Sequence, residues 1–341
     1  MSKVTVINWP FHDFVYKSYE DLFSIENIHE AWLKYKSGKS KKFDNMVFER
    51  NLEEEIFKLH DDLTSKNYRH GNYTKFVVHD GKKRTIHKAL VRDRVVHQII
   101  YDYLMMLYKL IFINDSYASL KERGTEKAVS RLRFFLEDEA VINFGKCFAL
   151  KCDIRKYFDS IDHEILFNII AQKIKDKEVL NIIKEIIESY NTLPAKGIPL
   201  GNMTSQIFAN IYLHDFDCFV KKDLQIRKYV RYNDDFIMVF RTEDKAYKTI
   251  PYIMDFINKK RLLCIPDSKI SVVKFNWGVE FLGRIILPKA VILRKKTLAK
   301  AFHNITKNNL SSYFGLFSHT SSFNISRKLR NYVENLMPID V

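Results

Sequence analysis

Residues 230–240 read VRYNDDFIMVF, in which two apolar and aromatic runs flank a polar tip. This pattern predicts a strand, a tight turn at Asn233-Asp234 and a second strand. Taken alone, such a tip is compatible with a solvated turn. The other interpretation is that Asp234 and Asp235 bind divalent metal ions, because hard cations such as Mg²⁺ take carboxylate oxygens. A two-metal site for phosphoryl transfer then needs a further carboxylate from a different strand.

Asp153 is the candidate for that further carboxylate. Residues 147–163 read CFALKCDIRKYFDSIDH, which predicts an apolar strand ending at Asp153, a tight turn and a helix beginning near Asp162. We interpret Asp159 and Asp162 as turn and helix-cap residues and Tyr157 as a core residue. Phe158 lies just past the turn, where its ring is placed to pack beneath the sugar of an incoming nucleotide and exclude a 2′-hydroxyl. A plain core aromatic is the alternative there.

Two further segments carry candidate contacts. Residues 73–88 read YTKFVVHDGKKRTIHK, which predicts two strands joined at Asp80-Gly81. The basic second strand is either a solvated face or a finger that folds over a nucleotide triphosphate, with Arg84 as the charge clamp. Residues 198–206 read IPLGNMTSQ and precede an apolar helix. There Gly201 permits close backbone approach, and Asn202 and Thr204 are suited to capping, so an ordinary loop and cap remains an alternative.

Composition narrows the possible partners. The chain has 341 residues, with Lys+Arg 56 against Asp+Glu 41 and a formal net charge of +15. This excess predicts a basic surface that attracts a polyanion. No apolar run reaches the roughly 18 residues that a membrane-spanning helix needs, so we expect no membrane partner. The N-terminus lacks the apolar core of a signal peptide, and the four cysteines show no metal-binding spacing; both features favour a cytoplasmic location.

Together these segments resemble a bacterial reverse transcriptase, with the motifs in family order from about Tyr73 to Leu287. The matching segments are the basic hairpin with Arg84, the Ser116-Tyr117-Ala118 loop with Gly124-Thr125, Asp153 to Phe158, Pro199 to Gln206, Tyr232 to Asp235, the Lys269 segment and Phe281-Leu282-Gly283. The resemblance implies an α+β right-hand polymerase fold with fingers, palm and thumb. We expect a helical N-terminal extension over residues 1–70, fingers and palm over 71–290, and a short helical thumb over 291–341.

The resemblance also implies an activity and a set of site residues. The activity is RNA-directed DNA polymerisation by two-metal nucleotidyl transfer, with Mg²⁺ or Mn²⁺ as cofactor. Its partners are an RNA template or structured non-coding RNA, a DNA or RNA primer and deoxynucleoside triphosphates. The implied catalytic and metal-binding residues are Asp153, Asp234 and Asp235. The implied nucleotide contacts are Lys75, Arg84, Phe158, Leu200, Gly201, Gln206 and Lys269, and the implied primer grip is Phe281, Leu282 and Gly283.

Within the family, the segment GNMTSQ at residues 201–206 is similar to the motif of diversity-generating retroelement enzymes. Leu200 stands where related enzymes have a glutamine that helps to check the incoming nucleotide, which implies low fidelity. Asn233 stands where Ala, Met or Val is commoner. The resemblance to the retroelement enzymes also implies a small basic accessory protein. Phage-defence reverse transcriptases share much of the pattern and are the alternative, and a non-catalytic RNA-binding scaffold is a third.

Overall fold

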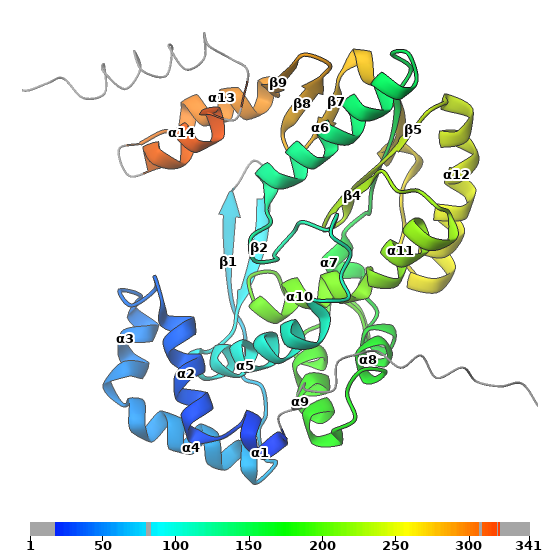
Figure 1. Ribbon diagram of the computed structural model, residues 1–341. Coiled ribbons are helices and arrows are strands. Elements are labelled where there is room, and N and C mark those ends of the chain that lie inside the picture. The colour runs from blue at the N-terminus through cyan, green and yellow to red at the C-terminus, as the bar shows by residue number, and fades with distance from the viewer. Residues whose placement is uncertain (1–17, 80–82, 307–308, 319, 321–341) are drawn as a thin grey trace, which may run out of the picture.

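The computed structural model describes residues 18–79, 83–306, 309–318 and 320 of the chain. Its N-terminal part is a group of helices that packs on the long helix α5 (Val91–Tyr108). Figure 1 shows this group at one end of the molecule. Within the predicted helical extension over residues 1–70, the structure has helices between Tyr19 and Thr64. The set comprises α1 (Tyr19–Leu22), α2 (Ile25–Lys36), α3 (Phe43–Arg50) and α4 (Leu52–Thr64).

A two-stranded hairpin follows this helical group. Strands β1 (Thr74–His79) and β2 (Lys83–Lys88) pair antiparallel, with Thr74 opposite Lys88. The two strands were predicted from their alternating pattern. The predicted turn at Asp80-Gly81 lies outside the described residues, as does the C-terminal part of the predicted thumb, residues 321–341.

The central sheet has four antiparallel strands in the order β4-β5-β3-β6. Strand β3 (Phe148–Asp153) lies between β5 (Asp235–Phe240) and β6 (Ile270–Lys274), and β4 (Tyr229–Tyr232) forms the edge beside β5. The strand and hairpin predicted at residues 147–153 and 230–240 are therefore confirmed, and the fold makes them neighbours. Alternate side chains of β3 and β5 enter two different hydrophobic clusters, so both faces of the sheet are buried.

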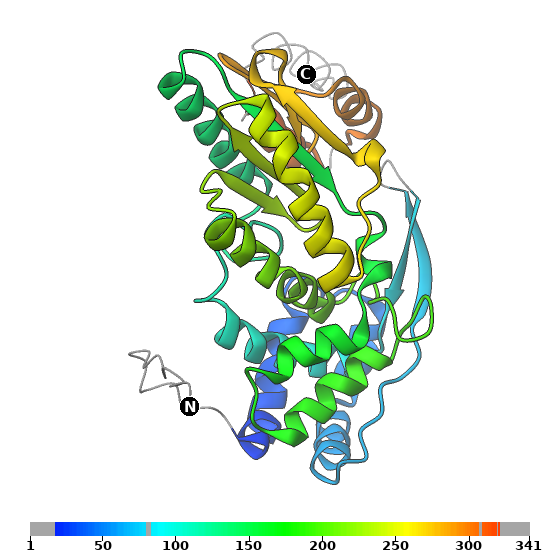
Figure 2. The same ribbon diagram turned by 90° about the vertical axis from the view of Figure 1, so that its right-hand side faces the viewer.

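Helices cover the two faces of this sheet. Helix α6 (Thr125–Ile142) packs on β4 and β5, and α12 (Glu243–Asp255) packs on β3, β5 and β6. Figure 2 shows α12 lying across the sheet. Between β3 and β4 the chain forms a helical excursion made of α7 (Tyr157–Ser160), α8 (His163–Ala171), α9 (Lys177–Glu188), α10 (Met203–Tyr212) and α11 (His214–Cys218). Asp162 caps α8 by accepting from the amide of Ile165, as predicted.

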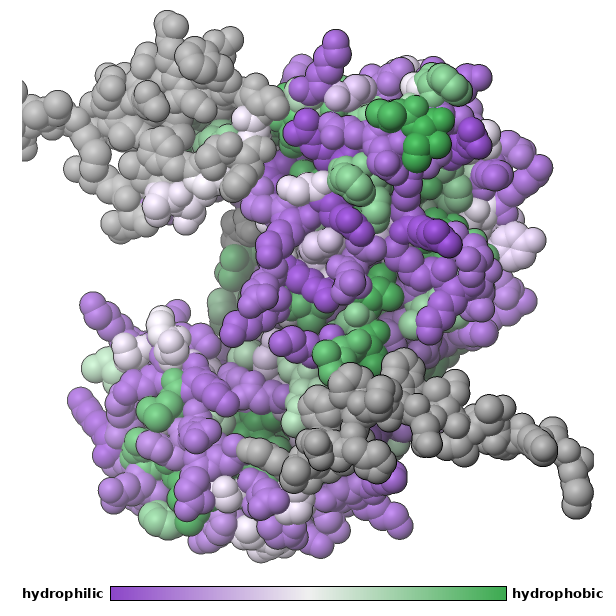
Figure 3. Space-filling model, in the orientation of Figure 1, coloured by the Kyte–Doolittle hydropathy of each residue, from purple (hydrophilic) through white to green (hydrophobic). Residues whose placement is uncertain are grey.

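The C-terminal part contains a small sheet and two helices. Strands β7 (Val279–Phe281), β8 (Arg284–Leu287) and β9 (Ala290–Leu293) pair in sequence order, and α13 (Lys295–Asn304) and α14 (Leu310–Ser318) follow. In Figure 3 the outline is hollowed between the N-terminal helices and the part of the chain that holds α13 and α14. No helix among the described residues is long and apolar enough to cross a bilayer. Cys147 and Cys152 are buried, whereas Cys264 is exposed.

Candidate active site

The hairpin tip between β4 and β5 is a two-residue turn. Tyr232 and Asp235 are the last partners of the ladder, so Asn233 and Asp234 form the turn, as predicted. Asn233 has a φ of 52°, in the left-handed region that asparagine adopts more readily than other non-glycine residues. The turn therefore places Asp234 at the tip and returns Asp235 to the ladder.

The ladder between β3 and β5 brings the candidate carboxylates together. Asp153 and Asp235 are direct antiparallel partners, and the amide of Ile154 donates to Asp234 O at 3.2 Å. Side chains of directly opposed residues project to the same face of a sheet, with Cβ atoms about 5 Å apart. The three aspartates predicted from separate stretches of sequence thus lie at one end of two neighbouring strands.

Two lysines pair with these aspartates. Lys269 Nζ donates to Asp153 Oδ2 at 2.8 Å, and this hydrogen bond raises the pKa of Lys269. Lys151 Nζ lies 3.8 Å from Asp235 Oδ2 and donates to the carbonyl oxygen of Glu280 at 3.0 Å. Burial of its carboxyl group raises the pKa of Asp235 to about 7. The neighbouring carboxylates add to this upward shift, and Lys151 opposes it only in part. Negative charge is therefore crowded at this edge.

The donor set fits a hard divalent cation, but the side chains do not form a closed metal cage. Oxygen ligands from carboxylates are those that Mg²⁺ prefers. Asp235 Oδ1 is buried and lacks a hydrogen-bond partner in the described part of the chain, so it retains an unused acceptor. Among those same residues, however, no three His, Cys, Asp or Glu side chains are grouped closely enough to hold a metal ion. Asp153 is paired with Lys269 instead.

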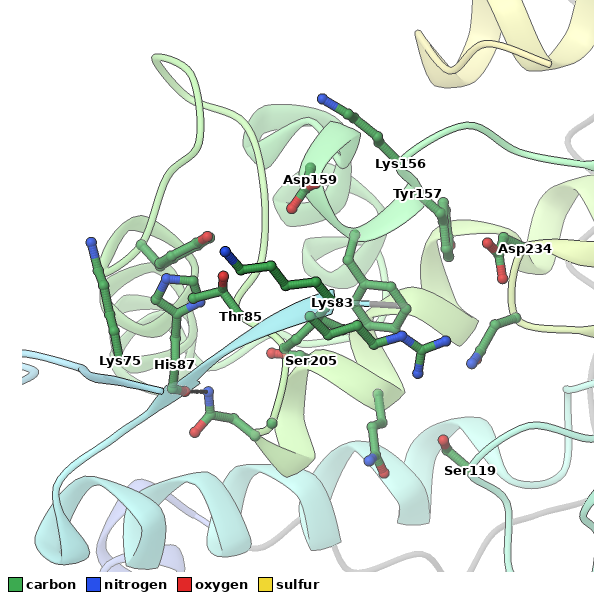
Figure 4. A pocket seen from close by; sticks show the side chains of 18 residues that line it. Lys75, Lys83, Thr85, His87, Ser119, Lys156, Tyr157, Asp159, Ser205 and Asp234 are labelled. Carbon is green, nitrogen blue, oxygen red and sulfur yellow. Dashed lines mark hydrogen bonds between the residues drawn. The ribbon is translucent and has the colours of Figure 1, made fainter. Parts of the chain in front are cut away.

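A cavity of about 800 Å³ opens beside Asp234, between the β1–β2 hairpin and the helices α7 and α10. Figure 4 shows lysine side chains from both the hairpin and the loop before α7 around it. Of the predicted nucleotide contacts, six line this cavity: Lys75, Arg84, Phe158, Leu200, Gly201 and Gln206. Phe158 also packs against the core, as the alternative interpretation of this residue expected. Lys269 is at the neighbouring carboxylate edge.

The loop before α10 is fastened to strand β2. The amide of His87 donates to Leu200 O at 3.0 Å, and Asn202 Nδ2 donates to His87 O at 2.9 Å. Gly201, with φ +109°, lies so close to β2 that an added Cβ would be 2.5 Å from Ile86 Cγ2. The predicted close approach at Gly201 is confirmed, and it is what joins this wall of the cavity to the hairpin.

Some local predictions in this region were wrong. Asn202 occupies the N-cap position of α10, but its side chain makes no capping bond because it is used on His87. Thr204 lies inside the helix, and its hydroxyl is bonded to His97 Nδ1 at 2.5 Å. In both cases the side chain forms a hydrogen bond with a histidine more than a hundred residues away in the sequence.

The predicted primer grip lies on the other side of the carboxylates. Phe281 is buried at the end of β7, and Leu282 and Gly283 form the turn to β8 with φ values of 48° and 79°. These residues do not line the cavity. They are connected to the aspartates through Lys151, which contacts both Asp235 and the neighbouring Glu280.

Several residues that line the cavity were not predicted as nucleotide contacts: Lys83, Thr85, His87, Ser119, Lys156, Tyr157, Asp159, Tyr190, Asn202, Ser205, Asn233 and Asp234. Asp234 was assigned to the metal site only, and Tyr157 is also buried in the core as expected. Lys83 and Thr85 line the cavity together with Arg84 between them, so alternation along β2 does not separate the lining residues from the others. No local sequence signal distinguishes Ser119 or Tyr190.

Comparison with known proteins identifies the family. Residues 74–286, more than half of the chain, match the model of the reverse transcriptase (RNA-dependent DNA polymerase) family. The chain belongs to the reverse transcriptase family. This segment includes both hairpins, strand β3 and all the predicted site residues.

Curated relatives of this reverse transcriptase include proteins encoded in introns. The group II intron-encoded protein LtrA of Lactococcus lactis is 26% identical over 147 residues, which are 41% of this chain and 23% of LtrA. Protein YkfC of Escherichia coli is 22% identical over 248 residues, 62% of this chain and 65% of YkfC. An uncharacterized 91 kDa protein in the cob intron of Schizosaccharomyces pombe is 29% identical over 148 residues, 41% of this chain and 17% of that protein. The matched region spans less than two thirds of the length of each of these relatives.

Solved structures confirm the fold class. The telomerase from Candida albicans, in complex with a fragment of telomeric RNA, aligns with a TM-score of 0.51 and 14% identity. The alignment covers 83% of this reverse transcriptase and 61% of the telomerase chain. The telomerase from Candida tropicalis gives a TM-score of 0.52 at 15% identity, covering 82% and 56% of the two chains. Together with the family match, this likeness supports the α+β right-hand polymerase fold.

Proposed function

We propose that this protein is an RNA-directed DNA polymerase in which Asp153, Asp234 and Asp235 form the catalytic centre. The observation that carries the proposal is the direct pairing of Asp153 with Asp235 beside the Asp234 turn. This pairing collects the three carboxylates at one end of two neighbouring strands, and Asp234 among them lines a cavity that also has cationic side chains on its walls. In this assignment residues 71–290 are the fingers and palm, residues 1–70 the N-terminal extension and residues 291–341 the thumb.

Each wall of the cavity has a function in this proposal. The cationic side chains of Lys75, Lys83, Arg84 and Lys156 bind the triphosphate of a deoxynucleotide, because charge-assisted hydrogen bonds to phosphate are strong. Phe158 packs beneath the sugar and leaves no space for a 2′-hydroxyl. Leu200, Gly201 and Gln206 support the base, and residues 281–283 hold the primer end so that its 3′-hydroxyl faces the α-phosphate.

The carboxylates would hold divalent ions, Mg²⁺ or Mn²⁺. When bound, such ions supply activation of the primer hydroxyl and neutralisation of charge on the triphosphate and pyrophosphate. Lys269 and Lys151, which now pair with Asp153 and Asp235, balance the charge of these carboxylates before the ions bind. Lys269 then becomes available to the nucleotide phosphates.

A double substitution, Asp234→Asn with Asp235→Asn, tests this assignment. We expect it to abolish Mg²⁺-dependent incorporation of deoxynucleotides on an RNA template, because amide side chains replace the proposed anionic ligands. The measurement is primer extension with purified protein. The matched control is Asp244→Asn, which changes an exposed aspartate on α12 and should keep wild-type extension. Extension at the wild-type rate by the double variant contradicts the assignment.

We further propose that the enzyme is bacterial and serves a diversity-generating retroelement with low fidelity. The supporting features are the GNMTSQ segment at 201–206 and Leu200, which lines the cavity where a hydrogen-bonding side chain is commoner. Its partners are then an RNA template, a primer and a small basic accessory protein. The telomerase neighbours are themselves described with RNA, which accords with an RNA partner.

The flanking DNA tests this biological role. A template–variable repeat pair beside the coding sequence supports diversification. If the repeat pair is absent and the coding sequence lies among defence genes, the result favours a phage-defence reverse transcriptase that works on an associated non-coding RNA. If purified wild-type protein binds RNA tightly yet extends no primer, the protein is a non-catalytic RNA-binding scaffold instead.

A further inference from the structure

Arg231 lies on β4, the first strand of the hairpin that carries Asp234 and Asp235, and its side chain is wholly buried. Its Nε and Nη2 donate to the two carboxylate oxygens of Asp217 at 2.7 and 2.6 Å. Asp217 is also wholly buried and accepts from Tyr229 Oη at 2.7 Å. The pair is bidentate, the geometry that gives the strongest arginine–carboxylate contacts.

The third nitrogen of the Arg231 guanidinium points in another direction. Its Nη1 donates to Asn233 O at 3.2 Å and to Asn210 Oδ1 at 3.4 Å. Asn233 is the first residue of the catalytic turn. Asn210 lies on α10 one helical turn after Gln206, which lines the cavity. The guanidinium therefore contacts two separate walls of the active site.

A third wall is connected through the same residues. Asn210 Nδ2 donates to Ala118 O at 2.9 Å, and the next residue, Ser119, lines the cavity. The backbone of Arg231 also holds this loop directly. Its amide donates to Asp115 O at 2.9 Å, and its carbonyl accepts from the amide of Tyr117 at 3.0 Å. Hairpin, helix and loop thus meet at one buried arginine.

Stability alone does not account for such an ion pair. A buried ion pair loses so much hydration that apolar residues of similar volume often serve the fold equally well or better. A lysine would keep the charge, but its single ammonium cannot present donors to Asp217, Asn210 and Asn233 at once. The planar guanidinium of arginine can donate to all three residues, which indicates that this position requires the donor geometry of arginine.

We propose that Arg231, held in place by Asp217, is a positioning residue that fixes the Asn233 carbonyl and so sets the catalytic hairpin against the nucleotide cavity. The inference rests on the proposed polymerase function. It predicts that loss of the guanidinium displaces the carboxylates without changing their identity. Such displacement lowers the stabilisation of the transition state more than the affinity for the nucleotide. We therefore expect kcat to fall while KM for the nucleotide changes little.

The test replaces both members of the pair, Arg231→Met with Asp217→Leu, so that no unpaired charge stays buried. We expect a folded protein whose kcat is lowered about 10- to 100-fold, the loss of one hydrogen bond from a charged donor. Amide hydrogen exchange supplies a second readout that needs no activity. The Ile154 amide, which donates to Asp234 O, should exchange faster than in the wild type.

The matched control is Arg261→Met. Arg261 is also buried, but its guanidinium donates to Tyr212 O at 2.8 Å, to Lys260 O at 2.9 Å and to Asp215 at 2.5 Å rather than to the hairpin that carries Asp234 and Asp235. It should leave kcat and the Ile154 amide unchanged. If the double variant does not fold, Arg231→Lys is measured with the same two readouts and the same expected direction.

A folded double variant, or Arg231→Lys, with wild-type kcat and wild-type exchange at Ile154 overturns the proposal. Equal effects from Arg261→Met overturn it as well, since any buried arginine would then suffice. If the wild-type protein extends no primer, the proposed function fails, whereas exchange at Ile154 still decides whether Arg231 positions the hairpin.

Discussion

At the scale of single residues, Asn233 illustrates how backbone conformation selects a side chain. Its φ of 52° is costly for the Ala, Met or Val that are commoner at this position in the family it resembles. Asparagine tolerates this conformation, which gives the residue a physical explanation that the sequence alone did not supply. Its Oδ1 is buried and makes no hydrogen bond within the described structure. The residue thus serves the turn through its backbone, including the carbonyl that Arg231 holds.

Leu200→Gln is expected to lower misincorporation opposite template adenine, by about tenfold, because an amide at this position adds a hydrogen-bonding check on the incoming base. Leu200 lines the cavity, and its carbonyl already fastens the loop to β2, so the backbone should be preserved. The measurement is sequencing of cDNA made from a defined RNA template. The control is Leu262→Gln, at an exposed position. An unchanged error spectrum counts against low fidelity arising at Leu200.

At the scale of elements, the sequence was informative wherever a pattern is local. Both hairpins and strand β3 were predicted because their alternation and turn residues act over a few positions. The capping predictions for Asn202 and Thr204 failed because His87 and His97, distant in sequence, take those side chains. Asp153 and Lys269 are 116 residues apart in the sequence, so no local pattern could predict that they pair. Local pattern singled out Arg84, Phe158 and Gly201, whereas Lys75, Leu200, Gln206 and Lys269 were named only through the family resemblance.

Helix α5 carries an internal histidine that makes the fold sensitive to acid. His97 Nε2 lies 2.9 Å from His70 Nε2, and burial lowers the pKa of His97 well below 6.5. The unfolded chain binds a proton at this histidine below about pH 6.5, whereas the folded chain does not, so acid favours unfolding. The free energy of unfolding should fall by about 1.4 kcal/mol per pH unit from this group below that pH.

Denaturant unfolding at pH 7.5, 6.5 and 5.5 measures this effect. The variant His97→Gln should be less stable at pH 7.5 but should lose less stability on acidification. Burial also lowers the pKa of His87 and His214, so part of the pH dependence will persist. The exposed His29 supplies the control, and His29→Gln should keep the wild-type slope. An unchanged slope in His97→Gln shows that His97 is not the group responsible.

At the scale of the whole molecule, the net positive charge predicts how nucleic-acid binding depends on salt. The formal charge of +15 belongs to a molecule whose outline is hollowed on one side (Figure 3). If the basic surface binds a template–primer duplex as proposed, binding releases counterions from the phosphates of the duplex. Affinity should fall steeply with salt, by about 10³-fold between roughly 50 and 200 mM for about six phosphate contacts. Fluorescence anisotropy with a labelled RNA–DNA duplex measures this, and an affinity independent of salt contradicts electrostatic binding.

The pairing of Asp153 with Asp235 also has a consequence for folding. The two residues are neighbours across the sheet but about 80 residues apart along the chain, and closing such a loop costs chain entropy before any contact repays it. Pairing between strands so far apart along the chain is slow for this reason. A nascent chain that ends before β5 contains Asp153 but neither Asp235 nor the proposed catalytic centre. That centre requires the pairing of β3 with β5, so we expect a folding intermediate without this pairing to be inactive.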